Sequence, residues 1–369
     1  MGQTYIAPNL TAAQMVPKIY SAKLFTESLG ESFWIGRFAT KDFIRYGDGT
    51  MLGTDPGKPL QLLRDLEKVS GDTIQYDLIT DIKGDATYGD DIIKGKEAQL
   101  SFYTDQVHID QVRRSVDAGG RMTRKRTKHD LRNVGKDVLK RYFARFYDEA
   151  ITCYLAGTRG TGTAQWVLPT SWTGFASNSL ETPDTAHSFT IDGSGNISHT
   201  KTDATSFKLS WLDKLERYIS TLDVPPNPVF VDGEPCYILV LSPYAVEQLK
   251  ADTAANSWLE IQKNAGVRGT DNPLFKDALG KYGRFILHRY SKIPLTTSGS
   301  DTFSHNLLLG AQAGVVAFGD AGGQFGMNWV EETDDRGNRL VITAGSILGV
   351  KKCRFNSTDF GAITVWSKH

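Results

Sequence analysis

The chain has 369 residues, with 42 basic and 42 acidic side chains, so its formal net charge at pH 7 is zero. This balance gives no overall attraction to nucleic acid or to an anionic membrane. No stretch is long and apolar enough to span a bilayer, and the N-terminus lacks the pattern of a signal peptide. The three cysteines lie far apart, which argues against a disulfide framework. Together these features predict a soluble protein made in a reducing, intracellular compartment.

The first part of the chain is predicted to be an arm and a hairpin. Residues 1 to about 45 contain too few apolar residues for a core of their own, and Pro17 interrupts their helical signals. Residues 73–83 and parts of 100–112 alternate between apolar and polar, around a polar, glycine-rich stretch. We therefore expect an extended hairpin, which is marginal in water and needs a partner.

The longest predicted helix runs from Arg121 to Gly157, with Thr127 as a candidate N-cap. One apolar stripe is predicted to face the core, namely Leu131, Val134, Val138, Tyr142, Phe146, Ala150 and Tyr154. A second apolar edge follows beside it, formed by Leu139, Phe143, Ile151 and Leu155. Gly135 inside this helix costs about 1 kcal/mol relative to alanine. Either close packing or a bend point explains this glycine.

The rest of the chain mixes helical and strand patterns and ends in a strand-rich stretch, as expected of an α+β fold. Residues 158–200 are expected to form a loop with short strands, followed by an amphipathic helix over 204–222. A buried strand at 237–241 leads into a helix that begins at Ser242-Pro243. Further strands are predicted at residues 281–288, 306–318, 327–332, 339–343, 347–355 and 361–366.

Motifs that carry chemistry are weak or incomplete. Tyr88-Gly89-Asp90-Asp91 matches a two-metal polymerase quartet, but its polar flanks favour a charged loop tip. A calcium-loop pattern begins at Asp192, yet Ile197 and Asp203 occupy positions that need glycine and glutamate. No phosphate-binding loop or metal-ligand spacing is present. The sequence therefore predicts no catalytic, cofactor-binding or metal site, and a protein that is not an enzyme.

The strongest local charge feature is a basic run before the long helix. It consists of Arg113, Arg114, Arg121, Arg124, Lys125, Arg126 and Lys128. One explanation is a solvated face or ion pairs with a neighbouring subunit. The other is contact with nucleic-acid phosphates, which needs clustered basic side chains and no base recognition.

Several stretches, in order, resemble a known family. They are KVSGDTIQYDLITDIKGDATYGD with KGKEAQLSFYTDQVHIDQVRRSVDAGGRMTRKRTKHDLR, then YILVLSPYAVEQLKAD, LGKYGRFILHRYSKIP, NLLLGAQAGVVAFG and ILGVKKCRFNSTDFGAITVW. Together they cover most of the chain from about residue 68 onward. The sequence is similar to tailed-phage major capsid proteins, specifically those of the N-four-like podophages with the Hong Kong 97-type fold.

This resemblance implies a domain organisation that agrees with the patterns above. It implies an N-terminal arm (residues 1–68), an extended hairpin loop (69–112), a peripheral domain with a long spine helix (113–203), an axial domain (204–326), and returning peripheral strands with a final strand (327–369). It also implies that Gly135 is a candidate bend in the spine helix when the shell matures.

The function implied by the resemblance is mechanical. Copies would form hexamers and pentamers that tile an icosahedral shell around double-stranded DNA. The expected partners are other copies of the chain, a separate scaffolding protein, a portal protein, DNA held by non-specific contact and a decoration protein, with no membrane. The basic run would then face DNA or a neighbouring subunit. The protein is expected in the virion, after assembly in the bacterial cytoplasm.

Two alternatives remain at this point. An encapsulin-like shell would share the fold and enclose an enzyme in place of DNA. A β-rich glycan-binding or hydrolase module would use aromatic platforms, for which the candidates are Trp166, Trp172, Trp211 and Trp258.

Overall fold

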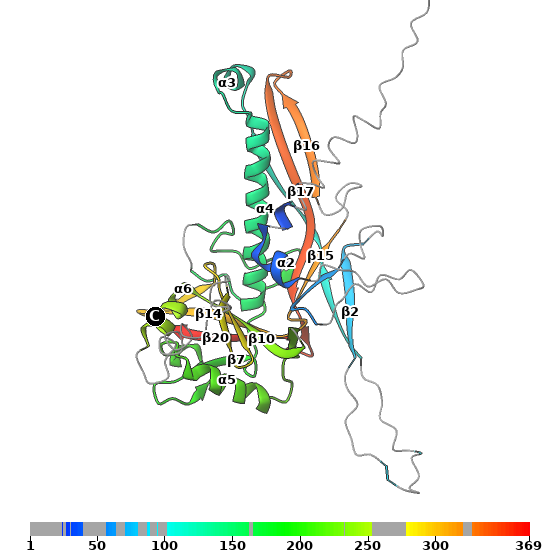
Figure 1. The fold of residues 1–369 in the computed structure, drawn as a ribbon. Coiled ribbons are helices and arrows are strands. Elements are labelled where there is room, and N and C mark those ends of the chain that lie inside the picture. Colours follow the sequence, from blue (N-terminus) through cyan, green and yellow to red (C-terminus); the bar gives the residue numbers. More distant parts are fainter. Residues whose placement is uncertain are drawn as a thin grey trace, which may run out of the picture.

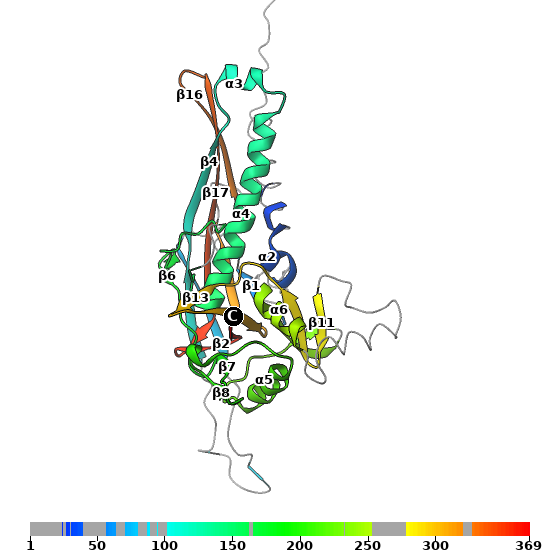
Figure 2. The same ribbon diagram turned by 90° about the vertical axis from the view of Figure 1, so that its left-hand side faces the viewer.

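The computed structural model describes residues 24, 27–29, 31–39, 57–63, 71–79, 87–88, 94, 102–161, 165–231, 233–252, 278–319 and 327–369. They form an elongated α+β molecule (Figures 1 and 2). One end is a long helix lying along long strands. The other end is a rounder body in which helices cover a second sheet.

A five-stranded sheet runs along the elongated end. Its strands are β1 (Leu60–Leu63), β4 (Asp110–Asp117), β15 (Gly314–Phe318), β16 (Met327–Asp334) and β17 (Arg339–Lys352). Strand β17 is the centre, because it pairs antiparallel with β4, β15 and β16. The predicted hairpin between β16 and β17 is confirmed. The predicted break between the strands at 339–343 and 347–355 is wrong. Strand β17 continues through Ala344, Gly345 and Ser346, which pair with β4.

The long helix is shorter than predicted. Helix α3 (Arg121–Arg126) ends at Thr127, and helix α4 (Leu131–Ala156) begins after Asp130. The Asp130 carboxylate accepts hydrogen bonds from the N–H groups of Arg132 and Asn133, so Asp130 is the N-cap and the prediction of Thr127 is wrong. The predicted end at Gly157 is confirmed, with φ of 69°, where glycine adopts the left-handed conformation freely.

The buried face of α4 differs from the predicted stripe. Leu139, Phe143 and Tyr147 are fully buried in one core with residues of β17, whereas Val134 and Val138 are 44% and 41% exposed. The second apolar edge therefore faces the sheet, and the predicted stripe is wrong in the N-terminal half of the helix.

Gly135 belongs to this buried face. A Cβ atom added at Gly135 would lie 3.3 Å from Cδ1 of Ile342, so the helix approaches β17 closely here. Close packing thus accounts for the glycine in this continuous helix, and its role as a bend point stays a prediction.

A nine-stranded sheet forms the centre of the rounder body. It contains β7 (Ser188–Ile191), β8 (Ile197–Ser198), β9 (Val229–Val231), β10 (Glu234–Leu241), β11 (Ala278–Tyr282), β12 (Phe285–Arg289), β13 (Leu295–Ser298), β14 (Asp301–Leu309) and β20 (Ala362–Lys368). Ile238 and Val240 of β10 belong to the core that includes α4. Leu239 and Leu241 belong to a second core with α5 (Ser210–Thr221) and α6 (Pro243–Ala251). Both faces are buried, which explains the continuous apolar run.

Several predicted boundaries in this body shift. Helix α5 begins at Ser210, later than predicted, whereas Ser242 caps α6 as predicted, by accepting from the Ala245 N–H. The predicted strand at 281–288 is a hairpin that turns at Gly283. The predicted strand at 306–318 is divided between β14 and β15, which belong to different sheets.

The strands of each sheet do not all come from one predicted domain. Strand β15 joins the five-stranded sheet although it lies within 204–326, and β7 and β8 join the nine-stranded sheet although they lie within 113–203. The domain boundaries themselves stay a prediction.

Part of the predicted arm packs on its own chain. In helix α2 (Phe33–Phe38), Trp34 is fully buried and Phe38 is 5% exposed, in the core shared with α4. Phe33 stacks on Tyr290, with ring centroids 4.5 Å apart. Aromatic side chains therefore give this segment a core that the count of apolar residues missed.

The remaining elements are short, apart from one hairpin. They are β2 (Thr73–Ile79) with β3 (Phe102–His108), β5 (Gly174–Phe175) with β6 (Asn178–Ser179), β18 (Arg354–Phe355) with β19 (Thr358–Asp359), and the 3-10 helix η2 (Lys201–Asp203).

Buried His305 gives the rounder body a dependence on pH. The indole N–H of Trp366 donates to Nδ1 of His305 at 3.2 Å, and Thr296 Oγ1 lies 2.9 Å from Nε2. Burial lowers the pKa of His305 to about 3, with a smaller effect from the Lys201 charge. Protonating Nδ1 would also set two N–H donors against each other.

We expect His305→Gln to reduce the acid sensitivity of folding. The unfolded state binds a proton below about pH 6.5 and the folded state does not, so stability falls as the pH drops from about 6.5 toward 3. Urea unfolding at pH 7 and pH 5 should show a wild-type loss about 2 kcal/mol larger than in His305→Gln. Exposed His129→Gln is the control, and equal losses in His305→Gln and wild type would contradict the prediction.

Candidate functional site

The β2–β3 hairpin is fixed at its base by a half-buried polar cluster. The two strands pair antiparallel over seven residue pairs. Asp105 of β3 accepts hydrogen bonds from the Tyr76 hydroxyl at 2.6 Å and from Lys351 Nζ of β17 at 2.5 Å. Burial raises the pKa of the neighbouring Cys353 thiol to about 12, and also raises the pKa of Tyr76. The base of the hairpin is thus bonded to the central strand.

A close backbone crossing fixes the direction of the hairpin. A Cβ atom added at Gly349 would lie 2.0 Å from the carbonyl oxygen of His108, so only glycine fits there. The amide side chain of Asn178 accepts from the N–H of His108 at 3.0 Å and donates to its carbonyl at 2.8 Å. Because both backbone groups are bound, the hairpin leaves the body in a defined direction.

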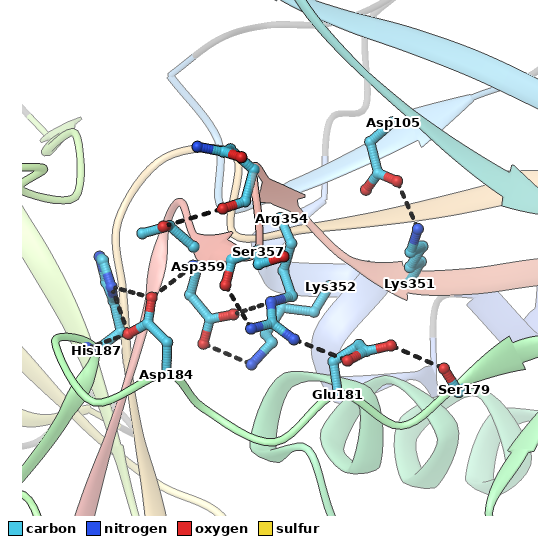
Figure 3. Close-up of polar contacts among 12 residues, drawn as sticks. Asp105, Ser179, Glu181, Asp184, His187, Lys351, Lys352, Arg354, Ser357 and Asp359 are labelled. Carbon is cyan, nitrogen blue, oxygen red and sulfur yellow. Dashed lines mark hydrogen bonds and ion pairs between the residues drawn. The ribbon is translucent and has the colours of Figure 1, made fainter.

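A second cluster, which we call the junction cluster, joins the two sheets just after β17 (Figure 3). It comprises Glu181, Asp184, His187, Lys352, Arg354 and Asp359. The Asp359 carboxylate forms ion pairs with Lys352 Nζ at 2.6 Å and with Arg354 Nε at 3.0 Å. Arg354 also forms an ion pair with Glu181 at 2.8 Å. Asp184 accepts from the N–H of Asp359 and from the N–H of His187.

The side chains of Lys352 and Asp359 are 2% and 1% exposed. Burial lowers the pKa of Lys352 and raises the pKa of Asp359. Because water cannot solvate either ion there, each charge depends on its partner. The junction cluster therefore fixes the geometry between the end of β17 and the segment before β7.

A third ionic contact joins the C-terminal half of α4 to the loop at residues 167–168 and to Lys292. Glu149 is fully buried in the helix, and its carboxylate accepts from the N–H groups of Val167 and Leu168 at 2.6 and 2.9 Å. Lys292 forms an ion pair with the same carboxylate. Glu149 was not among the residues predicted from the sequence. Its position between Phe146 and Ala150 of the predicted apolar stripe was the available signal.

The predicted basic run does not form one patch. Arg113 and Arg114 are neighbours on β4, so their side chains point to opposite faces of the sheet. Arg114 lies over the Tyr142 ring of α4, 5.5 Å from its centroid. Arg113 lines a hollow of about 240 Å³ on the other face, together with Gln111, Asn328, Val330, Glu332, Thr343 and Gly345.

The rest of the basic run lies at the α3 end of the molecule (Figure 1). Arg124 is half-buried and donates to the carbonyl of Asn338 in the β16–β17 turn at 3.2 Å, and the N–H of Arg121 donates to the Asn338 side chain at 3.1 Å. The side chains of Lys125, Arg126 and Lys128 are exposed. The structure therefore brings five of the seven residues together, two of them against a turn.

Other motifs from the sequence have structural explanations or lie outside the described residues. The Asp192 carboxylate accepts from the N–H groups of Ser194 and Asn196, which is a solvent turn. Asp90 and Asp91 lie outside the described residues. Within the described part, no group of His, Cys, Asp and Glu side chains could hold a metal ion, and no helix could span a membrane.

The aromatic-platform alternative loses its main candidates. Trp211 is 2% exposed in the core of the rounder body, Trp166 lies under the Arg159 guanidinium, and Trp172 packs edge-on against Tyr154. Trp258 lies outside the described residues.

Comparison with known proteins decides the family. The family model described as phage capsid protein matches residues 10–368. The chain belongs to this family. Among curated proteins, it is 27% identical over 346 residues to the major capsid protein of Pseudomonas phage KPP25, covering 85% of this chain and 89% of that protein.

Solved capsids agree with this assignment. The capsid of Ralstonia phage GP4 is 37% identical, with a TM-score of 0.76, over 91% of this chain and 90% of that chain. The capsid of cyanophage Pam1 is 23% identical, with a TM-score of 0.64, over 84% and 88%, and shows the likeness of fold. The chain is thus a phage major capsid protein, a subunit of an icosahedral shell, in a structural family that is not an enzyme family.

We expect Asp359→Asn in the junction cluster to lower the free energy of unfolding by about 3–5 kcal/mol, because the Lys352 ammonium would remain buried without its main counter-ion. The matched control is Asp301→Asn, which breaks the half-exposed ion pair with Lys368 and should cost less than about 1 kcal/mol. Urea unfolding measures both. A cost for Asp359→Asn no larger than that of the control would show that the buried pair is not stabilising.

Proposed function

We propose that the chain has the Hong Kong 97-type organisation of the N-four-like podophage capsids and assembles into hexamers and pentamers around the rounder body. The observation that carries this proposal is the arrangement of α4 along β17, with the β2–β3 hairpin and the nine-stranded sheet both attached near the C-terminal end of β17 (Figure 1). A long helix and sheet suit lateral contact between subunits. A hairpin that leaves the body from a fixed base suits contact with a neighbour.

The proposed shell encloses double-stranded DNA, which it contacts without sequence specificity. A separate scaffolding protein, a portal protein and a decoration protein are the other proposed partners, and assembly takes place in the bacterial cytoplasm. The likeness to the capsid of Ralstonia phage GP4 over nine-tenths of both chains supports a shell of this kind.

An encapsulin-like compartment is the alternative with the same fold. No feature of the described residues favours a cargo enzyme, and the family match and the relatives named above are phage capsids. Identification of the contents of purified shells distinguishes the two: nucleic acid supports the phage shell, and a folded enzyme supports the compartment.

Assembly of the purified full chain is the direct test. We expect electron microscopy and sedimentation to show rings, tubes or closed shells, alone or with the scaffolding protein. The physical reason is that a two-stranded hairpin is marginal in water by itself and gains packing from neighbours. A stable monomer under every condition tested would count against the proposed organisation.

The exposed part of the basic run is proposed to face DNA or a neighbouring subunit. Reversing Lys125, Arg126 and Lys128 to glutamate leaves the Arg121 and Arg124 contacts with Asn338 intact. We expect the triple variant to fold and to lose DNA retention or assembly, because three phosphate or carboxylate contacts become repulsive. Normal shells with unchanged DNA content would contradict the proposed role of these basic residues.

The same shells test the bend at Gly135. The Cβ of alanine at this position would lie 3.3 Å from Cδ1 of Ile342, the flexible end of that side chain, and 3.7 Å from Cγ1 of Val116, so the variant should fold. Normal expansion of Gly135→Ala shells would show that no bend is needed there.

A further inference from the structure

One outward-facing strip of α4 is divided into a covered and an open part. Residues seven apart lie on nearly the same side of a helix, because two turns take 7.2 residues. Val134, Arg141 and Asp148 therefore form one column, and Val138, Arg145 and Thr152 form the column beside it.

Helix α2 covers the C-terminal part of this strip. The Asp148 carboxylate accepts hydrogen bonds from the Ser32 hydroxyl at 2.5 Å and from the N–H groups of Phe33 and Trp34 at 3.1 and 3.2 Å. The Trp34 indole N–H donates to Thr152 Oγ1 at 2.7 Å. The C-terminal part of the strip thus already binds a helix, through the acidic side chain of Asp148 in α4 and the aromatic side chain of Trp34 in α2.

The N-terminal part is open, and we call it the valine–arginine stripe: Val134, Val138, Arg141 and Arg145. The two valines are 44% and 41% exposed, and both arginines are exposed. Arg141 donates only to the carbonyl of Asp137 in its own helix, and neither guanidinium forms an ion pair with a carboxylate of the described chain. Apolar and cationic side chains at helical spacing are therefore presented together.

We propose that the valine–arginine stripe binds an acidic amphipathic helix of a second protein that is present while the shell is built. The proposal rests on the proposed function, because it needs an assembling shell. The valines suit the apolar residues of such a helix, and the two arginines suit carboxylates one or two turns along it. The α2 contact continues the same strip, so a second helix extends an existing mode of packing.

Charge and packing argue against the other occupants. Residues 1–23 precede the covered segment but contain no aspartate or glutamate, so they cannot neutralise Arg141 and Arg145. DNA would neutralise the arginines but leaves the valines without an apolar partner. In a second copy, α5 and α6 bury their apolar faces in their own core.

The test places a photo-reactive residue, p-benzoylphenylalanine, at position 138 of the full chain during assembly in infected cells. We expect illumination to give an adduct with a different protein. Mass spectrometry should map it to a helix with acidic residues three or four apart. The matched control is the same residue at Val330, a 37% exposed valine on the other face of the five-stranded sheet, which should not give this adduct.

Adducts from position 138 to DNA, to residues 1–23 or to another copy would overturn the proposal, and so would shells that form without any adduct. Failure to form shells at all would instead count against the proposed function. Arg141→Glu with Arg145→Glu should lower the adduct yield roughly tenfold. The charge-matched pair Lys208→Glu and Arg217→Glu, two exposed residues of the rounder body, should not lower it, and equal loss in both pairs would also overturn the proposal.

Discussion

The packing of α4 on β17 is the contact on which the other parts of the molecule depend. Strand β17 pairs with β4, β15 and β16, and its inward residues lie in one core with Leu139, Phe143 and Tyr147 of the helix. The Tyr147 hydroxyl donates to Ser346 Oγ at 3.0 Å in the middle of this contact. Because protein interiors are close-packed, a shift of α4 along β17 would disturb the whole elongated end.

The two polar clusters at the end of β17 extend this constraint to the rest of the chain. Lys351 and Lys352 are neighbours on the strand, so they point to opposite faces. Lys351 reaches the hairpin through Asp105, and Lys352 reaches the junction cluster through Asp359. Consecutive residues of one strand therefore position both the hairpin and the nine-stranded sheet. For a shell subunit, this fixes the angles between the parts that would contact neighbours.

The sequence predicted most elements of the fold and two hairpins, but not the partners of the other elements. Periodicity located α4 and found both of its apolar edges, yet it could not tell which edge faces the sheet, because that depends on β17, some 200 residues away. The prediction of Thr127 as N-cap failed for a local reason, since the Asp130 side chain three residues later can cap a helix equally well. The ionic clusters were out of reach, because Glu149 and Lys292, or Asp105 and Lys351, become neighbours only in the folded chain.

The misassigned stripe also bears on how a shell protein can expose apolar side chains safely. Complete burial of a valine contributes about 1.5–3 kcal/mol, so burying two half-exposed valines contributes only a part of the sum. Association costs an estimated 4–15 kcal/mol, which exceeds this gain for a single copy. A binder linked across many copies would lose that freedom once and gain at every stripe. A weak, charge-flanked stripe can thus leave the free subunit soluble and still act strongly in an array of subunits.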